Sequence, residues 1–288
     1  MSGQEKTMAL TEHLAELRKR LIISVIAVSL GFFAAYYYSD RLYWVLASPL
    51  TDALPPGQDF LVFTGLVEPF FIYLKVGLLG GIILASPIVI YEVWAFVAPA
   101  LYREERWWFV FTVIFSALLF AGGTLFAFEV VFPFGFKYLL SYSAPGLKPF
   151  LSMGEYFSMA TRLLLAFGLI FQLPLAMLVL SRLGVVTARQ MASWWRYALV
   201  AIVIASAILT PTPDVFNQLL MAGPLVILYA VGVGAAAMFG KKKEAETELA
   251  QAEKGNSDFV WQKAGVQTLK GNLYRSRKDS NKALAAYK

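Results

Sequence analysis

The stretch LLLAFGLIFQLPLAMLVL, residues 163–180, contains one polar side chain, Gln172, and no charged residue. It forms most of the apolar segment Tyr156–Leu180, and a helix needs about 20 such residues to cross a bilayer. We therefore interpret this segment as a membrane-spanning helix. Five other segments share its apolar character and are predicted to span the membrane as well: Leu21–Tyr38, Pro69–Val97, Trp107–Phe136, Trp194–Leu209 and Val215–Phe239.

The composition favours an all-α protein with several membrane spans. Hydrophobic residues make up 58% of the chain and charged residues only 15%, which lies outside the range of soluble globular domains. The segment Trp194–Leu209 is shorter than the others and reaches only about 24 Å as a helix. We expect it to thin the local membrane, to sit low in the bundle, or to begin in the interface at Trp194 and Trp195.

Basic residues collect in the loops on one side of the predicted spans: Lys6, Arg18, Lys19, Arg20, Arg103, Arg106, Arg182, Arg189, Arg196 and Lys241 to Lys243. The opposite loops hold only Arg41, Lys137 and Lys148 outside the apolar segments. The positive-inside rule therefore places both termini in the cytoplasm. The net charge of +6 is then a signal of topology, and its spread among loops argues against a nucleic-acid partner.

Cysteine is absent and His13 is the single histidine. Disulfides, thiolate chemistry and a metal centre built from histidines are therefore excluded within one chain. The predicted spans contain no catalytic constellation of side chains. We expect neither an enzyme nor a bound cofactor.

The chain divides into four predicted regions. Residues 1–20 form a cytoplasmic amphipathic helix whose leucines repeat every three to four residues, and residues 21–239 form a kinked six-span membrane domain. Residues 240–257 form a charged cytoplasmic linker. Residues 258–288 contain LKGNLYRSRKDSNKALAAYK, which resembles part of a tetratricopeptide repeat. A charged pair of amphipathic helices is the alternative for this tail.

Two carboxylates are predicted to lie on the cytoplasmic face, Glu16 in HLAELRKRL, residues 13–21, and Glu105 in YREERWW, residues 102–108. In the simplest interpretation, Glu16 forms an exposed ion pair with Arg20 at i+4, and Glu105 belongs to a solvated charge cluster. In the alternative, both bind a ligand that carries guanidinium groups. Carboxylates and guanidinium groups form paired, charge-assisted hydrogen bonds that lysine cannot duplicate.

Polar side chains also occur within the apolar segments, where such groups usually face a bundle interior, a cavity or a partner. Lys75 and Arg162 lie near the outer ends and can reach the interface. Glu92 and Gln172 lie deeper, and Glu129 is intermediate.

Prolines within the segments predict kinked helices that form a concave wall: Pro87, Pro174 and Pro224. Before the last segment, LTPTPDVFNQ, residues 209–218, makes a tight turn in which Asp214 is predicted to cap the following helix.

Several motifs together resemble the C subunit of the twin-arginine protein translocase, the TatC family. They are HLAELRKRL at 13–21, SPL at 48–50, SPIVIYEVWAFVAPALYREER at 86–106, FAFEVVFP at 126–133, AFGLIFQLP at 166–174 and LTPTPDVFNQ at 209–218. The resemblance covers residues 8–239. It implies a multi-pass protein of the cytoplasmic (inner) membrane with six spans and both termini inside.

The resemblance further implies a receptor for twin-arginine signal peptides. In an oligomeric assembly with single-span subunits of the TatA/TatB type, such a receptor exports folded proteins by means of the proton-motive force. By position, the resemblance assigns signal-peptide binding to Glu16, Glu105, Arg18, Arg20 and Phe96. It assigns partner contacts or structural roles to Pro49, Glu92, Glu129, Gln172 and Asp214.

One position departs from the family pattern. Many members carry a glutamate where this chain has Gln172, so the resemblance implies a hydrogen bond to a partner helix there rather than a titrating carboxylate. A secondary transporter of a small solute is the alternative function. Such transporters usually show related halves with broken helices at corresponding positions, and the sequence shows no internal repeat of this kind.

Overall fold

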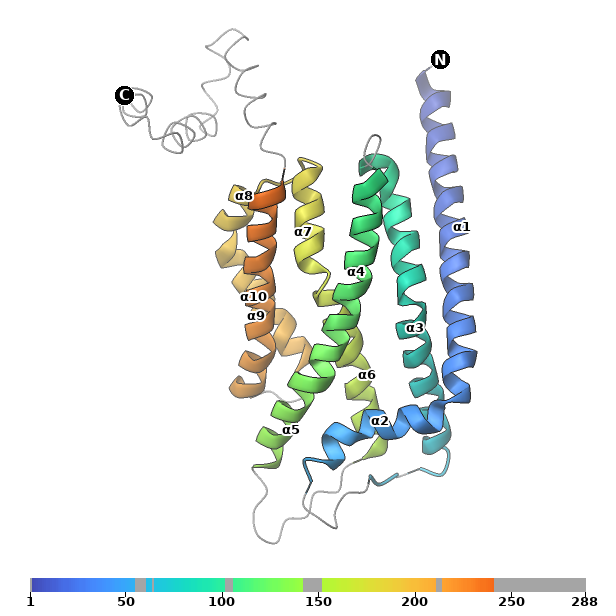
Figure 1. Ribbon diagram of the computed structural model, residues 1–288, viewed down its shortest axis with the longest axis vertical. Coiled ribbons are helices and arrows are strands. Elements are labelled where there is room, and N and C mark those ends of the chain that lie inside the picture. Colours follow the sequence, from blue (N-terminus) through green and yellow to red (C-terminus); the bar gives the residue numbers. More distant parts are fainter. Residues whose placement is uncertain are drawn as a thin grey trace, which may run out of the picture.

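The computed structural model describes residues 2–54, 61–63, 65–101, 106–141, 152–210 and 214–240, with side chains for all of these except 2–11, 98–101 and 106. The helices in chain order (Figure 1) are α1 Ser2–Tyr37, α2 Ser39–Thr51, α3 Glu68–Leu101, α4 Arg106–Phe126, η1 Ala127–Val131, α5 Phe132–Leu140, α6 Met153–Ile170, α7 Leu173–Arg182, α8 Ala188–Ser193, α9 Trp195–Leu209 and α10 Val215–Phe239. Within these ranges the only β-structure is an isolated bridge between Val62 and Ser152. The predicted all-α class is confirmed.

Five helical stretches in the described part of the chain are long and apolar enough to cross a membrane: Glu12–Tyr37, Glu68–Val97, Trp107–Leu140, Met153–Arg182 and Val215–Phe239. The apolar helix α9 is shorter. Each of these six overlaps one predicted segment. α1 begins and α10 ends at the same end of the bundle, which we call the N-terminal end (Figure 1).

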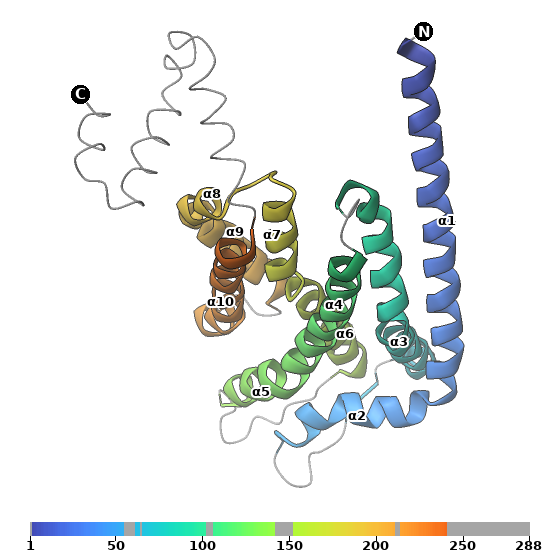
Figure 2. The same cartoon turned by 45° about the horizontal axis from the view of Figure 1, so that its top comes forward.

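The helices form a curved row rather than a closed ring (Figure 2). α1 packs on α3, α3 packs on α4 and α6, and α7 packs on α10, which also contacts α9. Among the five long apolar stretches, burial is lowest in α1, where 6% of the most apolar part is buried, and highest in α6 and α7, where 50% is buried. α1 therefore forms one edge of the row and depends on α3 for its position.

Glycines bring the backbones of the antiparallel helices α1 and α3 into close contact. A Cβ atom added at Gly31 would lie 2.6 Å from the carbonyl oxygen of Gly81, and one at Gly81 would lie 2.5 Å from the amide nitrogen of Phe32. A Cβ atom at Gly80 would lie 2.9 Å from the Cβ atom of Ala35. Small residues allow this approach of membrane helices, which pack by van der Waals contact. We call these contacts the glycine seam.

The third and fourth predicted spans each contain an interruption. α6 ends at Ile170 and α7 begins at Leu173, because Pro174 has no N–H to continue the hydrogen-bond ladder of α6. The third span contains the π-helix η1 between α4 and α5, which the sequence did not indicate. α3 and α10 continue through Pro87 and Pro224. Of the three prolines expected to kink a helix, only Pro174 therefore coincides with a break.

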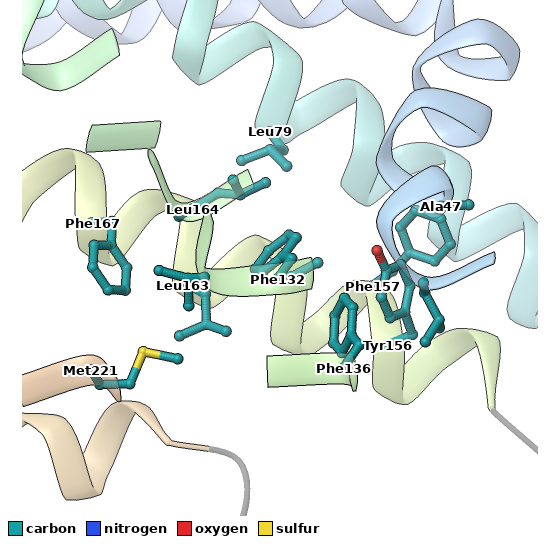
Figure 3. Close-up of a cluster of buried hydrophobic side chains, with 14 of the residues drawn as sticks. Ala47, Leu79, Phe132, Phe136, Tyr156, Phe157, Leu163, Leu164, Phe167 and Met221 are labelled. Atoms are coloured by element: carbon teal, nitrogen blue, oxygen red, sulfur yellow. The ribbon is translucent and has the colours of Figure 1, made fainter. Parts of the chain in front are cut away.

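α2 lies across the end of the bundle opposite the N-terminal end (Figures 1 and 2) and covers the main core. Tyr43 of α2 stacks on Phe157 of α6 with ring centroids 4.9 Å apart, and the hydroxyl of Tyr156 donates to the carbonyl of Leu46. Figure 3 shows the buried side chains around them, among them Ala47, Leu79, Phe132, Phe136, Leu163, Leu164, Phe167 and Met221. The short helix α2 therefore anchors this end of the bundle.

Glu68 joins the segments that lead into α3 and α6. Its Oε1 atom accepts a hydrogen bond from the backbone amide of Gly154 at 2.6 Å, and Oε2 accepts one from the amide of Gly65 at 3.2 Å. The amide of Met153 donates to the carbonyl of Val62 at 2.9 Å. A carboxylate that accepts from backbone amides at a helix start is stabilised by the helix dipole. These bonds fix the starts of α3 and α6 to each other.

Candidate functional site

Charged side chains of α1 and α3 meet between the glycine seam and the N-terminal end. Arg20 lies between two carboxylates, those of Glu16 on α1 and Glu92 on α3. Glu16 is one turn away on the same helix, whereas Glu92 is 72 residues away in the sequence. The antiparallel packing of α1 on α3 brings Glu92 to Arg20, so this site depends on the tertiary structure.

The guanidinium group of Arg20 uses three nitrogens in this contact. Nε and Nη2 donate to Oε1 of Glu16 at 3.1 and 2.6 Å, and Nη1 donates to Oε2 of Glu92 at 3.1 Å. The side chains of Arg20, Glu16 and Glu92 are 23%, 35% and 10% exposed. An exposed ion pair contributes little stability, but a buried carboxylate without a cation is costly. The predicted Glu16–Arg20 pair is confirmed, and Glu92 is a further partner.

One turn nearer the N-terminal end, His13 stacks on Phe96 with ring centroids 4.3 Å apart and an interplanar angle of 23°. This aromatic contact joins the same two helices as the Arg20 contact. Three residues predicted for signal-peptide binding, Glu16, Arg20 and Phe96, therefore lie on one α1–α3 surface.

The structure does not bring Arg18 to this surface. Arg18 is exposed and lies two residues from Glu16, which places it about 200° around the helix, on the side that faces away from α3. Glu105 lies outside the described residues. It falls between Leu101 at the end of α3 and Arg106 at the start of α4, both of which lie at the N-terminal end (Figure 1).

A second charged contact joins three other helices at the N-terminal end. The guanidinium carbon of Arg182, at the end of α7, lies 3.5 Å from the ring centroid of Trp108 near the start of α4. Its Nε atom donates to the carbonyl of Phe239 at the end of α10, at 3.1 Å. A cation–π contact of this kind contributes about 0.5–1 kcal/mol at exposed sites. In the sequence Arg182 served only as a topology signal, and this contact was not predicted.

Gln172 holds α4 to the break between α6 and α7. Its Nε2 atom donates to the backbone carbonyl of Ser116 at 2.9 Å, and its Oε1 atom accepts from the Ser116 hydroxyl. Ser116 is almost completely buried in α4. These bonds use one of the two N–H donors of the amide and one acceptor site of its oxygen, so Gln172 can form a hydrogen bond to a partner helix without breaking them.

Two more of the residues assigned partner or structural roles lie at the ends of other helices. Asp214 caps α10, because its Oδ1 atom accepts from the amide of Asn217 at 2.8 Å, which confirms the predicted cap. Pro49 is buried in α2, at the end of the bundle opposite the α1–α3 surface.

The other polar side chains that were singled out within the spans, Glu129, Lys75 and Arg162, lie on the surface. Glu129 is exposed in the π-helix η1. Lys75 and Arg162 are also exposed, as expected for side chains that reach toward the interface, and Lys75 donates to Ser158 Oγ at 2.9 Å. Of the predicted intramembrane polar residues, the structure therefore brings only Glu92 to the α1–α3 surface.

The arrangement at Arg20 is suited to hold a guanidinium group rather than a metal ion. Across the described residues, no three His, Cys, Asp or Glu side chains lie together in a way that could hold a metal. Two carboxylates instead surround a planar cation with several N–H donors, which is the geometry that arginine recognition needs.

The glycine seam was not predicted from the sequence, although a signal for it is present. Gly31 and Ala35 on α1, and Gly77 and Gly81 on α3, are each four residues apart. This small-xxx-small spacing is the known signal for close packing of membrane helices, and it could have predicted that α1 pairs with α3.

The chain is similar to known proteins over most of its length. Residues 12–224 match the family model of the Sec-independent protein translocase protein (TatC). The protein of that name from Desulforapulum autotrophicum is 44% identical and covers 94% of this chain and 98% of its own length. The one from Escherichia coli strain K12 is 37% identical and covers 80% of this chain and 88% of its own length.

A solved structure agrees with these relatives. The crystal structure of the twin-arginine translocase receptor TatC superposes with a TM-score of 0.71 at 38% identity, and the match covers 78% of this chain and 98% of that one.

The similarity to the Desulforapulum protein also bears on the tail. The part of this chain outside the match is shorter than the segment 241–288. The match therefore extends into this segment, which lies outside the described residues. The family model ends at residue 224.

The chain therefore belongs to the TatC family, the multi-pass, non-catalytic membrane components of the Sec-independent protein translocase.

Proposed function

We propose that this protein is the receptor subunit that binds twin-arginine signal peptides. With single-span subunits of the TatA/TatB type, in an oligomeric assembly, it exports folded proteins by means of the proton-motive force. The similar solved structure is that of a twin-arginine translocase receptor, which supports this role. Family membership also decides against the secondary transporter considered from the sequence.

The observation that carries the proposal is that Glu16 already binds a guanidinium group. Oε1 of Glu16 accepts two hydrogen bonds from Arg20, whereas Oε2 accepts none from the described residues. The side chain is 35% exposed, so a guanidinium group from outside can approach it. Such charge-assisted hydrogen bonds contribute about 1.5–3 kcal/mol each. Glu105 is proposed as the second arginine-binding carboxylate.

We propose that the α1–α3 surface faces the cytoplasm, with both termini inside the cytoplasmic membrane. The excess of Lys and Arg in the loops at the N-terminal end supports this orientation, and a peptide receptor must present its binding surface where the cargo is made. His13 and Phe96 give this surface an aromatic neighbour for the signal peptide, one turn from the carboxylate.

The experiment that tests the proposal is binding of the detergent-solubilised full-length protein to a twin-arginine peptide and to its Lys–Lys variant. The twin-arginine peptide should bind roughly tenfold more tightly or better, because lysine cannot make the paired contact. Glu105→Gln should weaken binding while the protein stays folded. Glu12→Gln, which removes an exposed carboxylate one turn before Glu16, is the control for general charge attraction and should change binding little. Equal affinity for the two peptides would refute the proposal.

A further inference from the structure

The guanidinium group of Arg20 donates hydrogen bonds to two carboxylates that differ in their exposure to solvent. Glu16 is 35% exposed, whereas Glu92 is 10% exposed. If Arg20 left both, Glu16 would be rehydrated and Glu92 would remain as a buried charge without a cation, which is far more costly. The energetic difference means that Glu16 can change its partner and Glu92 cannot.

The hydrogen bonds of Arg20 allow this separation. Nε and Nη2 donate to Glu16, and Nη1 donates to Glu92. The contact to Glu16 can therefore break while Nη1 stays on Glu92. In the structure, however, Arg20 holds Oε1 of Glu16, so an incoming arginine can pair with both oxygens of this carboxylate only after Arg20 has left. A site that is open only part of the time binds its ligand with an affinity reduced by that fraction.

We propose that Arg20 is an internal competitor for Glu16, and that Glu92 is the positioning residue that retains Arg20 when a peptide arginine takes its place on Glu16. This inference rests on the proposed function and adds a regulation of the same site. The bound state holds two guanidinium groups on two carboxylates, one from the peptide on Glu16 and one from Arg20 on Glu92. Glu92 keeps a cation throughout the exchange.

In this exchange Glu92 affects peptide affinity through Arg20 and need not contact the peptide itself. Without the charge of Glu92, Arg20 has Glu16 as its one remaining partner at this site and competes more strongly for it. Removal of Arg20 as well abolishes the competition. Substitution of Glu92 should therefore weaken peptide binding, and additional substitution of Arg20 should restore it. If Glu92 had only a structural role, both substitutions would weaken binding and their effects would add.

The test is the dissociation constant of a twin-arginine peptide, measured by calorimetry on the full-length protein in detergent. Glu92→Gln should weaken binding roughly fivefold, in the range of coupling between contacting charged residues. The double variant Arg20→Gln/Glu92→Gln should bind at least as tightly as the unmodified protein. Glu155→Gln, an exposed carboxylate at the opposite end, is the matched control and should bind normally. Thermal unfolding of each variant shows that it is folded.

Two outcomes would overturn the exchange. One is a double variant that binds more weakly than Glu92→Gln alone, and the other is a Glu92→Gln variant with unchanged affinity. Either result, in a protein that still prefers the twin-arginine peptide over its Lys–Lys variant, refutes the exchange and leaves the proposed function intact. Loss of that preference in the unmodified protein refutes the proposed function itself.

Discussion

Gly31 of α1 and Gly81 of α3 lie so close that a Cβ atom added at Gly31 would be 2.6 Å from the carbonyl oxygen of Gly81. This contact joins an edge helix that has few other neighbours to the rest of the bundle. The same pair of helices carries the contacts of Arg20 with Glu92 and of His13 with Phe96. The position of the proposed peptide site therefore depends on Gly31 and Gly81, which lie farther from the N-terminal end than the site does.

Gly81→Ala should lower stability and peptide affinity together. The new methyl group would meet backbone atoms of Gly31 and Phe32, which cannot move aside as a flexible side chain can, and overpacking costs about 1–3 kcal/mol. Thermal unfolding in detergent and peptide binding measure the two effects. Gly122→Ala in α4 is the control, since among the described residues no atom outside its chain neighbours and the adjacent backbone of α4 lies within 4 Å of its added Cβ. Equal stability of the two variants would show that α1 is not held by the glycine seam.

Gln172→Leu should reduce co-purification of a single-span partner subunit and lower thermal stability slightly. An interhelical hydrogen bond in a membrane contributes about 0.6 kcal/mol on average, and this substitution removes the bonds to Ser116. Ser116→Ala is the control, because it removes the hydroxyl but keeps the backbone carbonyl that Gln172 contacts. If partner crosslinking is unchanged in Gln172→Leu, the role of Gln172 is confined to the contact between α4 and the α6–α7 break.

The local features of this chain could be predicted from its sequence. Long apolar segments predict the helices, a proline predicts the break near Gln172, and the cap by Asp214 and the i,i+4 pair of Glu16 and Arg20 follow from neighbouring residues. These features depend on contacts within one or two turns, where the spacing along the chain determines the geometry.

The features that required the structure join residues distant in the sequence. Glu92 was recognised as a buried charge, but nothing in the sequence order names Arg20 as its partner. The amide of Gln172 could have faced any neighbouring helix, and it faces Ser116. The π-helix η1 also could not be predicted, because a single extra residue per turn leaves no apolar periodicity to detect. Helix pairing determines the partners of Glu92 and Gln172, and the glycine seam accounts only for the pairing of α1 with α3.

Ending the chain after Glu244 should preserve membrane insertion, thermal stability and peptide binding. The truncated chain retains the carbonyl of Phe239 that Arg182 contacts, and a helical bundle satisfies its backbone hydrogen bonds internally. Limited proteolysis of the full-length protein should remove the predicted linker and tail, residues 240–257 and 258–288, first. A lower unfolding temperature of the truncated protein would show instead that the tail packs on the bundle.

Reporter fusions should place both termini in the cytoplasm. Fusions after Asp52 and Lys148 should report the outer side of the membrane, and a fusion after Arg189 should report the cytoplasm, because Lys and Arg accumulate on that side. The orientation of the α1–α3 surface follows from this result. A cytoplasmic signal from the Lys148 fusion would contradict the topology.

The central claim is that the carboxylate of Glu16 recognises a guanidinium group of the signal peptide. Its most direct test is the ratio of the affinities for the twin-arginine peptide and its Lys–Lys variant, measured by calorimetry for the unmodified protein and for folded Glu16→Gln. The account predicts that the preference for arginine, roughly tenfold or more in the unmodified protein, falls toward one in Glu16→Gln, since the amide cannot form the charge-assisted pair. An undiminished preference for arginine in Glu16→Gln would contradict it.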